Sequence, residues 1–491
     1  MPFLLKFSSE ISRLHKLFNY SSTNSHIKAE SIQLHAHGQN GHPSRTEKCC
    51  SRLSQSMESA PWIPISKMQA LSFRERPLKG SIVVSKVQIP RPAEGEAESL
   101  RLKVWNAFKS KAEGIEKLDP PAACSTFDGE WVGVRNAFKT TQDSQVNMTD
   151  REKFNLIEQN RLNDLTFFYL SGGAWFRAGP PGARPLIKKI CERTGCRAFT
   201  FQYRLVPQYT LPTLVLDVLT AYFYLLSPPP GSFHEPVDPK KLILVGESGG
   251  GILDLDILQF LQYLHTTAPN ENSRMDFFGR NVPLDMPAGC AIICPGTDIA
   301  LSLSSVKKYE KTDWLSEFAP WLEPNFPADS IWPSDPPRGD LHCDNSAICH
   351  PFVDPSTWAD WRGMPLMWIA CGQETYSDGI KFLVRNIRAS DVSVKFVDYE
   401  FMPHVWNVVI PALPQSQHVM KLWAEACLEL GSSVVGKRQS DVWYVRLGDL
   451  ETVRQKFDDL LDLSNDEVLK RMRAARDELA TFVWRGPAAK L

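Results

Sequence analysis

The stretch "KLILVGESGGGILDL" (residues 241–255) is an apolar run that stops at Gly246, passes through a cluster of glycines and continues with a helical pattern. A P-loop is excluded because no lysine stands where G-x-x-x-x-G-K-[S/T] requires one, and the glycine offsets do not fit the dinucleotide fingerprint G-x-G-x-x-G. Residues 246–250 fit G-x-S-x-G, in which a strained turn between a strand and a helix presents a serine. The motif predicts Ser248 as a nucleophile, and a purely structural strand-to-helix turn remains the alternative.

Strand and helix patterns alternate on both sides of this turn. Strands are predicted at 81–89, 165–170, 197–203, 241–246, 288–295, 365–371 and 392–401, and helices at 97–118 and 211–226. Short apolar strands that alternate with helices are typical of an α/β fold with a mostly parallel sheet covered by helices on both faces. Such a sheet carries its chemistry on the loops at the carboxyl ends of its strands.

Two further strand ends supply partners for the serine. In this architecture the triad runs Ser, acid, His along the chain. His404 follows the strand at 392–401, and Glu374 and Asp378 follow the strand at 365–371. Glu374 is nearer to its strand end, so we predict it as the triad acid, with Asp378 as the reserve.

The loop after the strand at 165–170 predicts an oxyanion hole. It reads Ser171-Gly172-Gly173, and paired glycines allow backbone N–H groups to approach a substrate oxygen closely. We expect donors from Gly172 and Gly173, with a third from Gly249 directly after the serine. A simple glycine turn at a strand end is the alternative for this loop taken alone.

Composition sets limits on the class of protein. Of 491 residues, 43% are hydrophobic and 23% charged, with a net charge of -1, so a nucleic-acid-binding surface is not expected. No stretch reaches about 18 uncharged apolar residues, so no transmembrane helix is predicted. An odd count of 11 cysteines without a secretory signal favours reduced thiols and a cytoplasmic location, although targeting by the N-terminal segment is left open.

One cluster has the residue types of a metal site. "LHCDNSAICH" (residues 341–350) contains His342, Cys343, Cys349 and His350. It has no C-x-x-C pair and no second half elsewhere, so we interpret it as a surface loop and predict no metal.

Several segments together resemble a known family. They are "YLSGGAWFRAG" (169–179), "FQYRLVPQYTLPTLVLDVLTAY" (201–222), "LVGESGGG" (244–251), "GQETYSD" (372–378) and "MPHVW" (402–406). These are similar to the "HGGG", "YRLAPEHPFP", "GDSAGG", "DPLRDE" and "PHVF" segments of the hormone-sensitive-lipase-like branch of the α/β-hydrolase fold. The resemblance spans about residues 80–430, in a form common among fungal esterases, with sterol-ester deacetylases nearest in general shape.

The resemblance implies a carboxylic-ester hydrolase that uses no metal or organic cofactor and acts on a small or apolar ester. We predict three parts of the chain: an extension (1–60) whose polar composition favours disorder, a hydrolase domain (61–430) with cap elements near 90–150 and 300–345, and a C-terminal extension (431–491) that is rich in helical patterns. A capping box at Ser464 and Glu467 opens the last predicted helix. The oligomeric state is not predicted.

The chain departs from the family pattern at four positions. Ser171 replaces a histidine, Gly249 replaces an alanine, and Asp254 and Asp256 occur where small apolar residues are usual. A buried carboxylate without a partner is costly. These departures favour a second hypothesis, a non-catalytic ligand-binding pseudohydrolase, while an amide or formamide hydrolase with the same triad is a third.

Overall fold

The computed structural model describes residues 63–135, 147–177, 179–267, 274–315, 329, 331, 340–432 and 439–481. The extension predicted for residues 1–60 lies outside the described residues. No helix in the described part of the chain is both long and apolar enough to cross a membrane.

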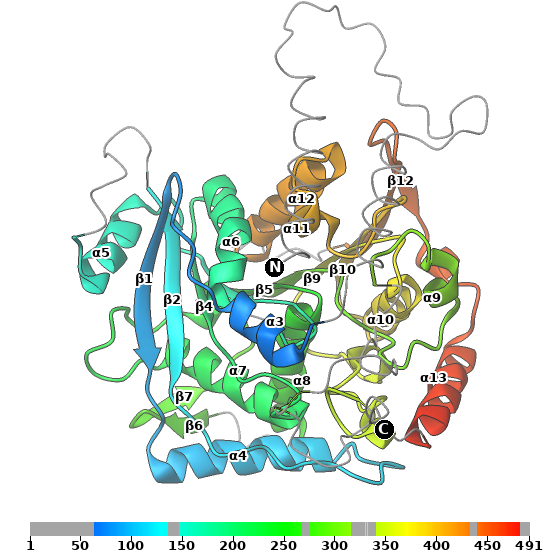
Figure 1. Ribbon diagram of the computed structural model, residues 1–491, viewed down its shortest axis with the longest axis horizontal. Helices are drawn as coiled ribbons and strands as arrows, with labels where there is room; N and C mark the ends of the chain where they lie inside the picture. Colours follow the sequence, from blue (N-terminus) through cyan, green and yellow to red (C-terminus); the bar gives the residue numbers. More distant parts are fainter. Residues whose placement is uncertain are drawn as a thin grey trace, which may run out of the picture.

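A ten-stranded sheet forms the centre of the molecule (Figure 1), in the order β1-β2-β4-β3-β5-β8-β9-β10-β11-β12. The six neighbouring strand pairs from β4 to β11 are parallel, and the pairs at the two edges are antiparallel. The strands are β1 (Ile82–Ile89), β2 (Phe127–Val134), β3 (Thr166–Leu170), β4 (Arg197–Phe201), β5 (Leu242–Glu247), β8 (Gly289–Ile293), β9 (Met367–Gly372), β10 (Val394–Tyr399), β11 (Asp441–Val445) and β12 (Thr452–Gln455). A separate hairpin pairs β6 (Arg274–Phe277) with β7 (Arg280–Pro283).

The central strands are short apolar runs because both of their faces are covered. Every residue of β3, β4, β8 and β9 is buried. Leu170 pairs with Gly246, and Glu247 pairs with Ile293, so the carboxyl ends of β3, β5 and β8 lie at the same edge. Tyr399 pairs with Gly372, which brings β9 and β10 to an end together as well.

Helices cover both faces of the sheet. In Figure 1, α6 and α12 lie above the central strands, and α7, α8 and α4 lie below them; α10 packs against β9 and β10. The helices are α3 (Ile65–Ser72), α4 (Glu94–Lys109), α5 (Asp150–Asn160), α6 (Pro180–Thr194), α7 (Leu211–Leu226), α8 (Gly249–Thr267), α9 (Ser304–Tyr309), α10 (Ser377–Ala389), α11 (Trp406–Val409), α12 (Pro414–Leu430) and α13 (Asn465–Ala480). Short 3₁₀ turns occur at Pro239–Lys241, Asn345–Ala347, Pro355–Thr357 and Phe457–Leu460.

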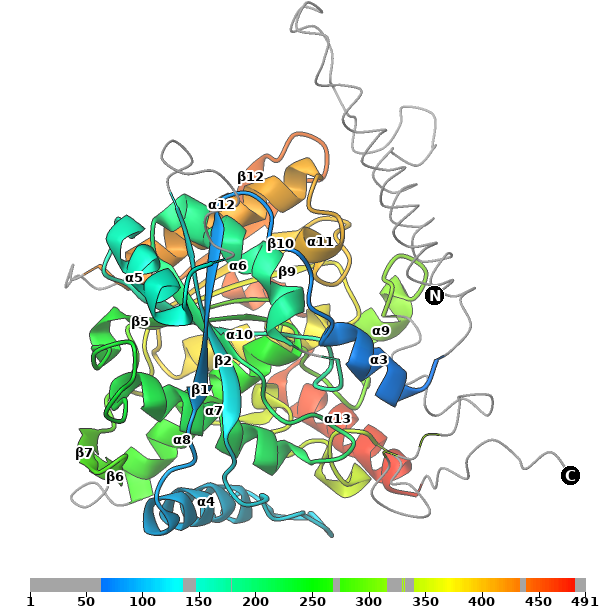
Figure 2. The same ribbon diagram turned by 60° about the vertical axis from the view of Figure 1, so that its left-hand side comes forward.

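The segment expected to form a cap at about 90–150 belongs instead, where it is described, to the body of the fold. β2 pairs with β1 and β4 inside the sheet, and α4 packs against α7 and α8. Both views place α4 beside the β6–β7 hairpin (Figures 1 and 2), where the Glu96 carboxylate accepts hydrogen bonds from the N–H groups of Phe278 and Gly279. The apolar face of α4, with Leu100, Val104 and Phe108, explains this position because it is buried in the main core.

The segment expected to be a helical extension at the C-terminus contains two strands as well as a helix. β11 joins β10 in parallel, and β12 closes the edge of the sheet. The predicted capping residue Ser464 begins α13, where its side chain accepts a hydrogen bond from the Glu467 N–H group at 3.3 Å. Strands of only four or five residues, partly buried in β11 and mostly exposed in β12, carry too weak a periodicity to be found from the sequence.

Candidate active site

Ser248 stands on the turn between β5 and α8 with φ = 53°, a strained value for a residue with a side chain. The glycines of the motif allow this turn. A Cβ atom on Gly250 would lie 2.0 Å from the Leu170 carbonyl oxygen, and one on Gly246 would lie 2.4 Å from an Asp254 oxygen. The sequence therefore folds as a sharp elbow that exposes the serine at the carboxyl edge of the sheet.

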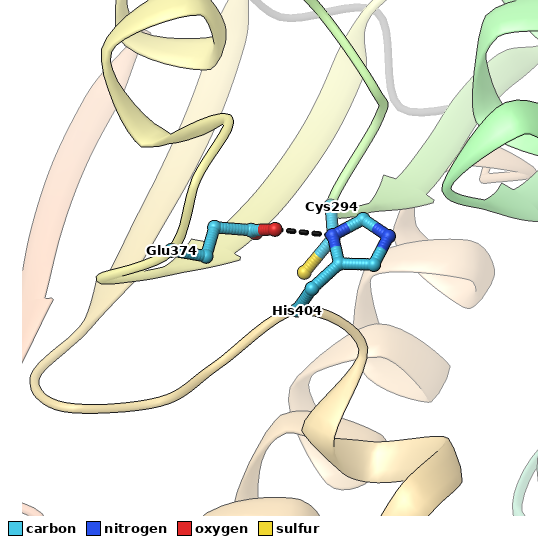
Figure 3. A group of neighbouring side chains, drawn as sticks. All are labelled: Cys294, Glu374 and His404. Atoms are coloured by element: carbon cyan, nitrogen blue, oxygen red, sulfur yellow. Dashed lines mark hydrogen bonds and ion pairs between the residues drawn. The ribbon is translucent and has the colours of Figure 1, made fainter. Parts of the chain in front are cut away.

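The structure brings Ser248, His404 and Glu374 together. His404 Nε2 lies 2.8 Å from Ser248 Oγ, and His404 Nδ1 makes a short hydrogen bond to Glu374 Oε2. Figure 3 shows the Glu374 carboxylate pointing at the imidazole from the end of β9, while His404 comes from the loop after β10. Glu374 is fully buried and His404 is 3% exposed. A serine, an imidazole and a carboxylate in this chain of contacts can perform nucleophilic catalysis.

The surroundings of His404 favour its charged form. Burial alone lowers the pKa of the imidazole, but the Glu374 carboxylate and its hydrogen bond outweigh burial, so the pKa is raised above its ordinary value. The carboxylates of Asp313 and Glu247 act in the same direction. This is the arrangement that stabilises an imidazolium after it takes the proton of a serine.

Asp378, the reserve acid, lies in a different arrangement. Its Oδ2 accepts a hydrogen bond from the Ser305 N–H at 2.9 Å, and its own N–H donates to Ser305 Oγ at 3.2 Å. Asp378 therefore ties the start of α10 to α9, while Glu374 is the carboxylate that contacts the imidazole.

The predicted oxyanion loop lies against the nucleophile. A Cβ atom on Gly172 would be 2.5 Å from the Glu247 carbonyl oxygen and 2.9 Å from Ser248 Cβ, which explains the need for glycine. However, the Gly172 N–H donates to Glu247 Oε1 at 2.9 Å, and Tyr169 donates to the other oxygen of that carboxylate. Since this N–H is already engaged, it is not free to bind an oxyanion in this conformation.

The next two backbone N–H groups have no such partner. Within the described residues, no acceptor is recorded for the N–H groups of Gly173 and Ala174, nor for that of Gly249 at the start of α8. Gly173 has φ = 108°, which a glycine adopts without strain, and Ala174 has φ = 48°, a strained value for a residue with a side chain. The sequence did not point to the Ala174 N–H, because only the paired glycines marked the loop.

Trp175 explains the glycine after the nucleophile. Its indole Nε1 donates to the Gly249 carbonyl oxygen at 2.7 Å, and a Cβ atom on Gly249 would lie 2.9 Å from that nitrogen. The alanine usual in the family would collide with the indole. Gly249 and Trp175 therefore form a matched pair that joins the oxyanion loop to the elbow.

The two aspartates in α8 are fully buried. None of the carboxyl oxygens of Asp254 and Asp256 has a hydrogen-bond partner among the described residues. Burial raises the pKa of both groups well above the ordinary value, which favours the neutral acid form. Protonation lowers the cost of placing them in the core.

Cys294 completes the group of side chains with metal-ligand chemistry in this region. It follows β8, and its sulfur lies within 4.8 Å of ligand atoms of Glu374 and His404 (Figure 3). A cation here would have to break the contact between Glu374 and His404, and burial raises the pKa of the Cys294 thiol well above its ordinary value. The residues therefore fit a proton-relay pair better than a resident metal.

The segment 341–350 is not a surface loop as we predicted, since His342, Cys343 and His350 are buried. His350 Nε2 lies 3.0 Å from the Phe108 carbonyl oxygen, and its ring stacks on the Phe108 ring. His350 thus packs against α4, whereas the His342 ring meets the Trp175 indole at 4.9 Å between ring centroids. The histidines and cysteines looked exposed in the sequence because the stretch lacks a periodic apolar pattern.

Comparison with known proteins agrees with this geometry. Residues 167–408 match a family described as having the alpha/beta hydrolase fold. A crystal structure of an esterase from the bacterial hormone-sensitive lipase family superimposes with a TM-score of 0.51 at 18% identity, covering 80% of this chain and all of that one. This chain has the α/β-hydrolase fold. The predicted fold class is thereby confirmed, while the fungal sterol-ester subtype remains a prediction.

Two curated proteins are similar to this chain over part of their length. The acetyl-hydrolase of Streptomyces hygroscopicus is 24% identical over 267 residues, which are 54% of this chain and 76% of that protein. Lipase 2 of Moraxella sp. (strain TA144) is 23% identical over 201 residues, 40% of each chain. Both similarities are distant.

Proposed function

We propose that this chain is a serine hydrolase of carboxylic esters with Ser248 as nucleophile. The observation that carries the proposal is the continuous contact from Ser248 Oγ through both ring nitrogens of His404 to the buried Glu374 carboxylate. Such a chain of contacts makes a serine hydroxyl nucleophilic at neutral pH, because the imidazole can accept its proton.

The proposed reaction follows from these contacts. Ser248 Oγ attacks the ester carbonyl carbon while His404 Nε2 accepts the hydroxyl proton, and His404 then gives this proton to the departing alcohol. Glu374 holds the imidazole in the correct tautomer and stabilises its charged form. A water molecule, activated by the same imidazole, releases the acyl group from the serine.

We propose that the oxyanion of the tetrahedral intermediate accepts hydrogen bonds from the N–H groups of Gly173, Ala174 and Gly249. Ala174 takes the place of Gly172, which the sequence had predicted as a donor. The engaged Gly172 N–H supports this revision. In this arrangement Glu247 stabilises the loop from behind by holding Gly172 and Tyr169. Removal of one oxyanion donor typically costs about 3 kcal/mol of transition-state stabilisation.

We propose a short acyl group, acetyl first, on an apolar alcohol. The similarity to an acetyl-hydrolase supports the acyl group, and the sequence resemblance to sterol-ester deacetylases supports the alcohol. The two rival functions are a ligand-binding pseudohydrolase and an amide or formamide hydrolase. The unpaired Asp254 and Asp256 favour the first, but the 2.8 Å contact of Ser248 with His404 favours catalysis.

A graded series of p-nitrophenyl esters, from acetate to decanoate, tests the proposal. We expect turnover that is highest for the short acyl chains and that is lost in Ser248→Ala. Turnover of an N-acyl analogue above the matching ester would favour the amide hydrolase. Equal and negligible rates in the wild type and in Ser248→Ala would contradict catalysis and favour the binding protein.

A further inference from the structure

Asp313 lies in the segment that follows α9, far in sequence from the residues of the triad. Its side chain is fully buried. Oδ2 accepts a hydrogen bond from the Thr375 N–H at 2.7 Å, and Oδ1 accepts one from the His404 N–H at 3.1 Å. One carboxylate therefore bridges the residue directly after the triad acid and the triad histidine itself.

We propose that Asp313 is a positioning residue that fixes the acid loop and the base loop relative to each other and adds a further negative charge beside the His404 imidazole. This inference rests on the proposed ester hydrolysis and assigns a further residue to it. Nothing in the G-x-S-x-G, acid and histidine pattern marks Asp313, because it acts through backbone N–H groups.

The position of Asp313 is itself fixed. Its N–H donates to the Tyr309 carbonyl oxygen at 2.8 Å at the end of α9. At the start of the same helix, Ser305 Oγ donates to the Thr375 carbonyl oxygen at 2.7 Å, and Asp378 accepts from the Ser305 N–H. The start of α9 is thus attached to the loop that carries Glu374, and its end is attached to Asp313. Movement of the Asp313 carboxylate would therefore also disturb Glu374.

The charge of Asp313 has a separate effect. Burial raises the pKa of its own carboxyl, and its charge contributes to raising the pKa of His404. The imidazole also faces other groups from every neighbouring element: Glu374 after β9, Glu247 at the end of β5, Ser248 at the elbow, Cys294 after β8 and the ring of Tyr376 at 5.4 Å. A change at Asp313 therefore alters one of three carboxylates that act on His404, and the effect on its titration is partial.

The two effects are separated by two substitutions. Asp313→Asn keeps the shape but removes the charge, and its amide nitrogen faces an N–H group that needs an acceptor. Asp313→Glu keeps the charge but is longer by one methylene group, so it disturbs the spacing of the loops. A displacement of about 1 Å in an active site can cost about 100-fold in rate.

The test compares kcat, KM and the pH dependence of kcat/KM for the wild type and both variants on p-nitrophenyl acetate. We expect kcat to fall about 10- to 100-fold in both variants, with KM changed by less than about threefold. We expect the ascending limb of the pH profile to move to lower pH in Asp313→Asn and to stay at the wild-type pH in Asp313→Glu.

Asp354→Asn is a matched control. Asp354 is equally buried and also bridges two segments, since its oxygens accept from the N–H groups of Ile299 and Ser356. It does not bond to the triad loops. The control is expected to lose stability but to keep the wild-type pH profile, which distinguishes a specific effect on His404 from general loosening.

Titration of the His404 ring by NMR gives a reading that does not depend on turnover. A lower His404 pKa in Asp313→Asn than in the wild type supports the proposed role of Asp313 even if no ester is hydrolysed. In that case only the proposed ester hydrolysis would be contradicted. An active wild type whose kcat, pH limb and His404 pKa are all unchanged in Asp313→Asn would overturn the role of Asp313. If Asp313→Asn does not fold, Asp313→Glu decides: wild-type kcat in that variant would contradict the positioning role.

Discussion

At the residue scale, the contact with Trp175 explains why position 249 is a glycine. A methyl group there would displace the Trp175 indole, whose N–H holds the Gly249 carbonyl oxygen. We expect Gly249→Ala to lower kcat about 10-fold through the adjoining oxyanion N–H, and to lower the free energy of unfolding by about 1–3 kcal/mol through overpacking. Ester turnover and chemical denaturation measure the two effects.

Gly95→Ala is the control for this substitution. A Cβ atom there meets nothing within 4 Å, and the residue lies in α4. We expect unchanged kcat and a gain of about 0.5–1 kcal/mol, because alanine favours a helix more than glycine does. If Gly249→Ala behaved like this control, the contact with Trp175 would not matter.

The two carboxylates after β9 provide a second comparison. Glu374→Gln keeps the size of the side chain but leaves the imidazole with the wrong partner, and we expect kcat to fall by about 10⁴-fold. Asp378→Asn leaves the imidazole contact intact and alters only the bond to Ser305, so a fall of less than about 10-fold is expected. Comparable losses in both variants would mean that the acid has been assigned to the wrong residue.

Much of the site could be predicted at this scale because it depends on order along the chain. Ser248, Glu374 and His404 each follow a strand, and the structure brings them within contact of one another. Glu247 and Asp313 were missed because they act on backbone N–H groups, which no residue pattern reveals. The hydrogen bond from the Gly172 N–H to Glu247 was missed for the same reason, since no residue pattern indicates that this N–H is occupied.

At the element scale, the C-terminal strands support the loop that carries His404. The Glu400 N–H donates to the Val445 carbonyl oxygen at 3.0 Å. Gln373 Nε2 donates to the Tyr444 hydroxyl at 3.3 Å, and Gln373 Oε1 accepts from the Phe401 N–H. β11 thus fixes β10 and the chain just beyond it, four residues before the catalytic candidate.

Two truncations distinguish the contribution of β11 and β12 from that of α13. A chain that ends at residue 432 loses β11, β12 and α13, and we expect kcat to fall at least about 100-fold through displacement of the His404 loop. A chain that ends at residue 463 keeps both strands and loses α13 with the residues after it; Val468 and Met472 of α13 are buried in a small separate cluster. This chain is expected to be less stable but to keep kcat within a few-fold; wild-type kcat in the shorter chain would refute the support role.

Elements were predictable where a pattern was long or fully apolar. α7 begins and ends where the sequence indicated, at residues 211 and 226, because all of its residues are buried. The segment at about 90–150 was misplaced because an amphipathic helix such as α4 looks the same whether it covers a pocket or a neighbouring helix. Contact with α7 and α8 decides between the two.

At the scale of the whole molecule, buried acids make the stability depend on pH. Asp298 is 1% exposed, and burial raises its pKa to about 7. The folded state therefore holds this proton up to about pH 7, whereas the unfolded chain releases it near pH 4. The free energy of unfolding consequently falls as the pH rises from about 4 to about 7. Above about pH 7 the contribution of Asp298 to this free energy is constant.

Asp298→Asn removes this pH-dependent contribution to the free energy of unfolding, because an amide does not titrate. Other titrating groups are common to both proteins, including His350, whose pKa burial lowers to about 4. We expect the stability of the variant relative to the wild type to rise by about 2 kcal/mol between pH 5 and pH 8. Denaturation at both pH values measures this difference, and Asp285→Asn, at an exposed position, should show none. An identical pH dependence in Asp298→Asn and the wild type would show that Asp298 is ionised throughout.

The central claim is that Ser248 is a nucleophile activated by His404. The most direct measurement is labelling by a fluorophosphonate probe, followed by peptide mapping, in the wild type, Ser248→Ala and His404→Ala. A nucleophilic Ser248 should carry stoichiometric label in the wild type and none in Ser248→Ala, and labelling should be slowed by about 10³-fold or more in His404→Ala. A wild type that resists the probe, or that carries it on another residue, would show that Ser248 is not the activated nucleophile.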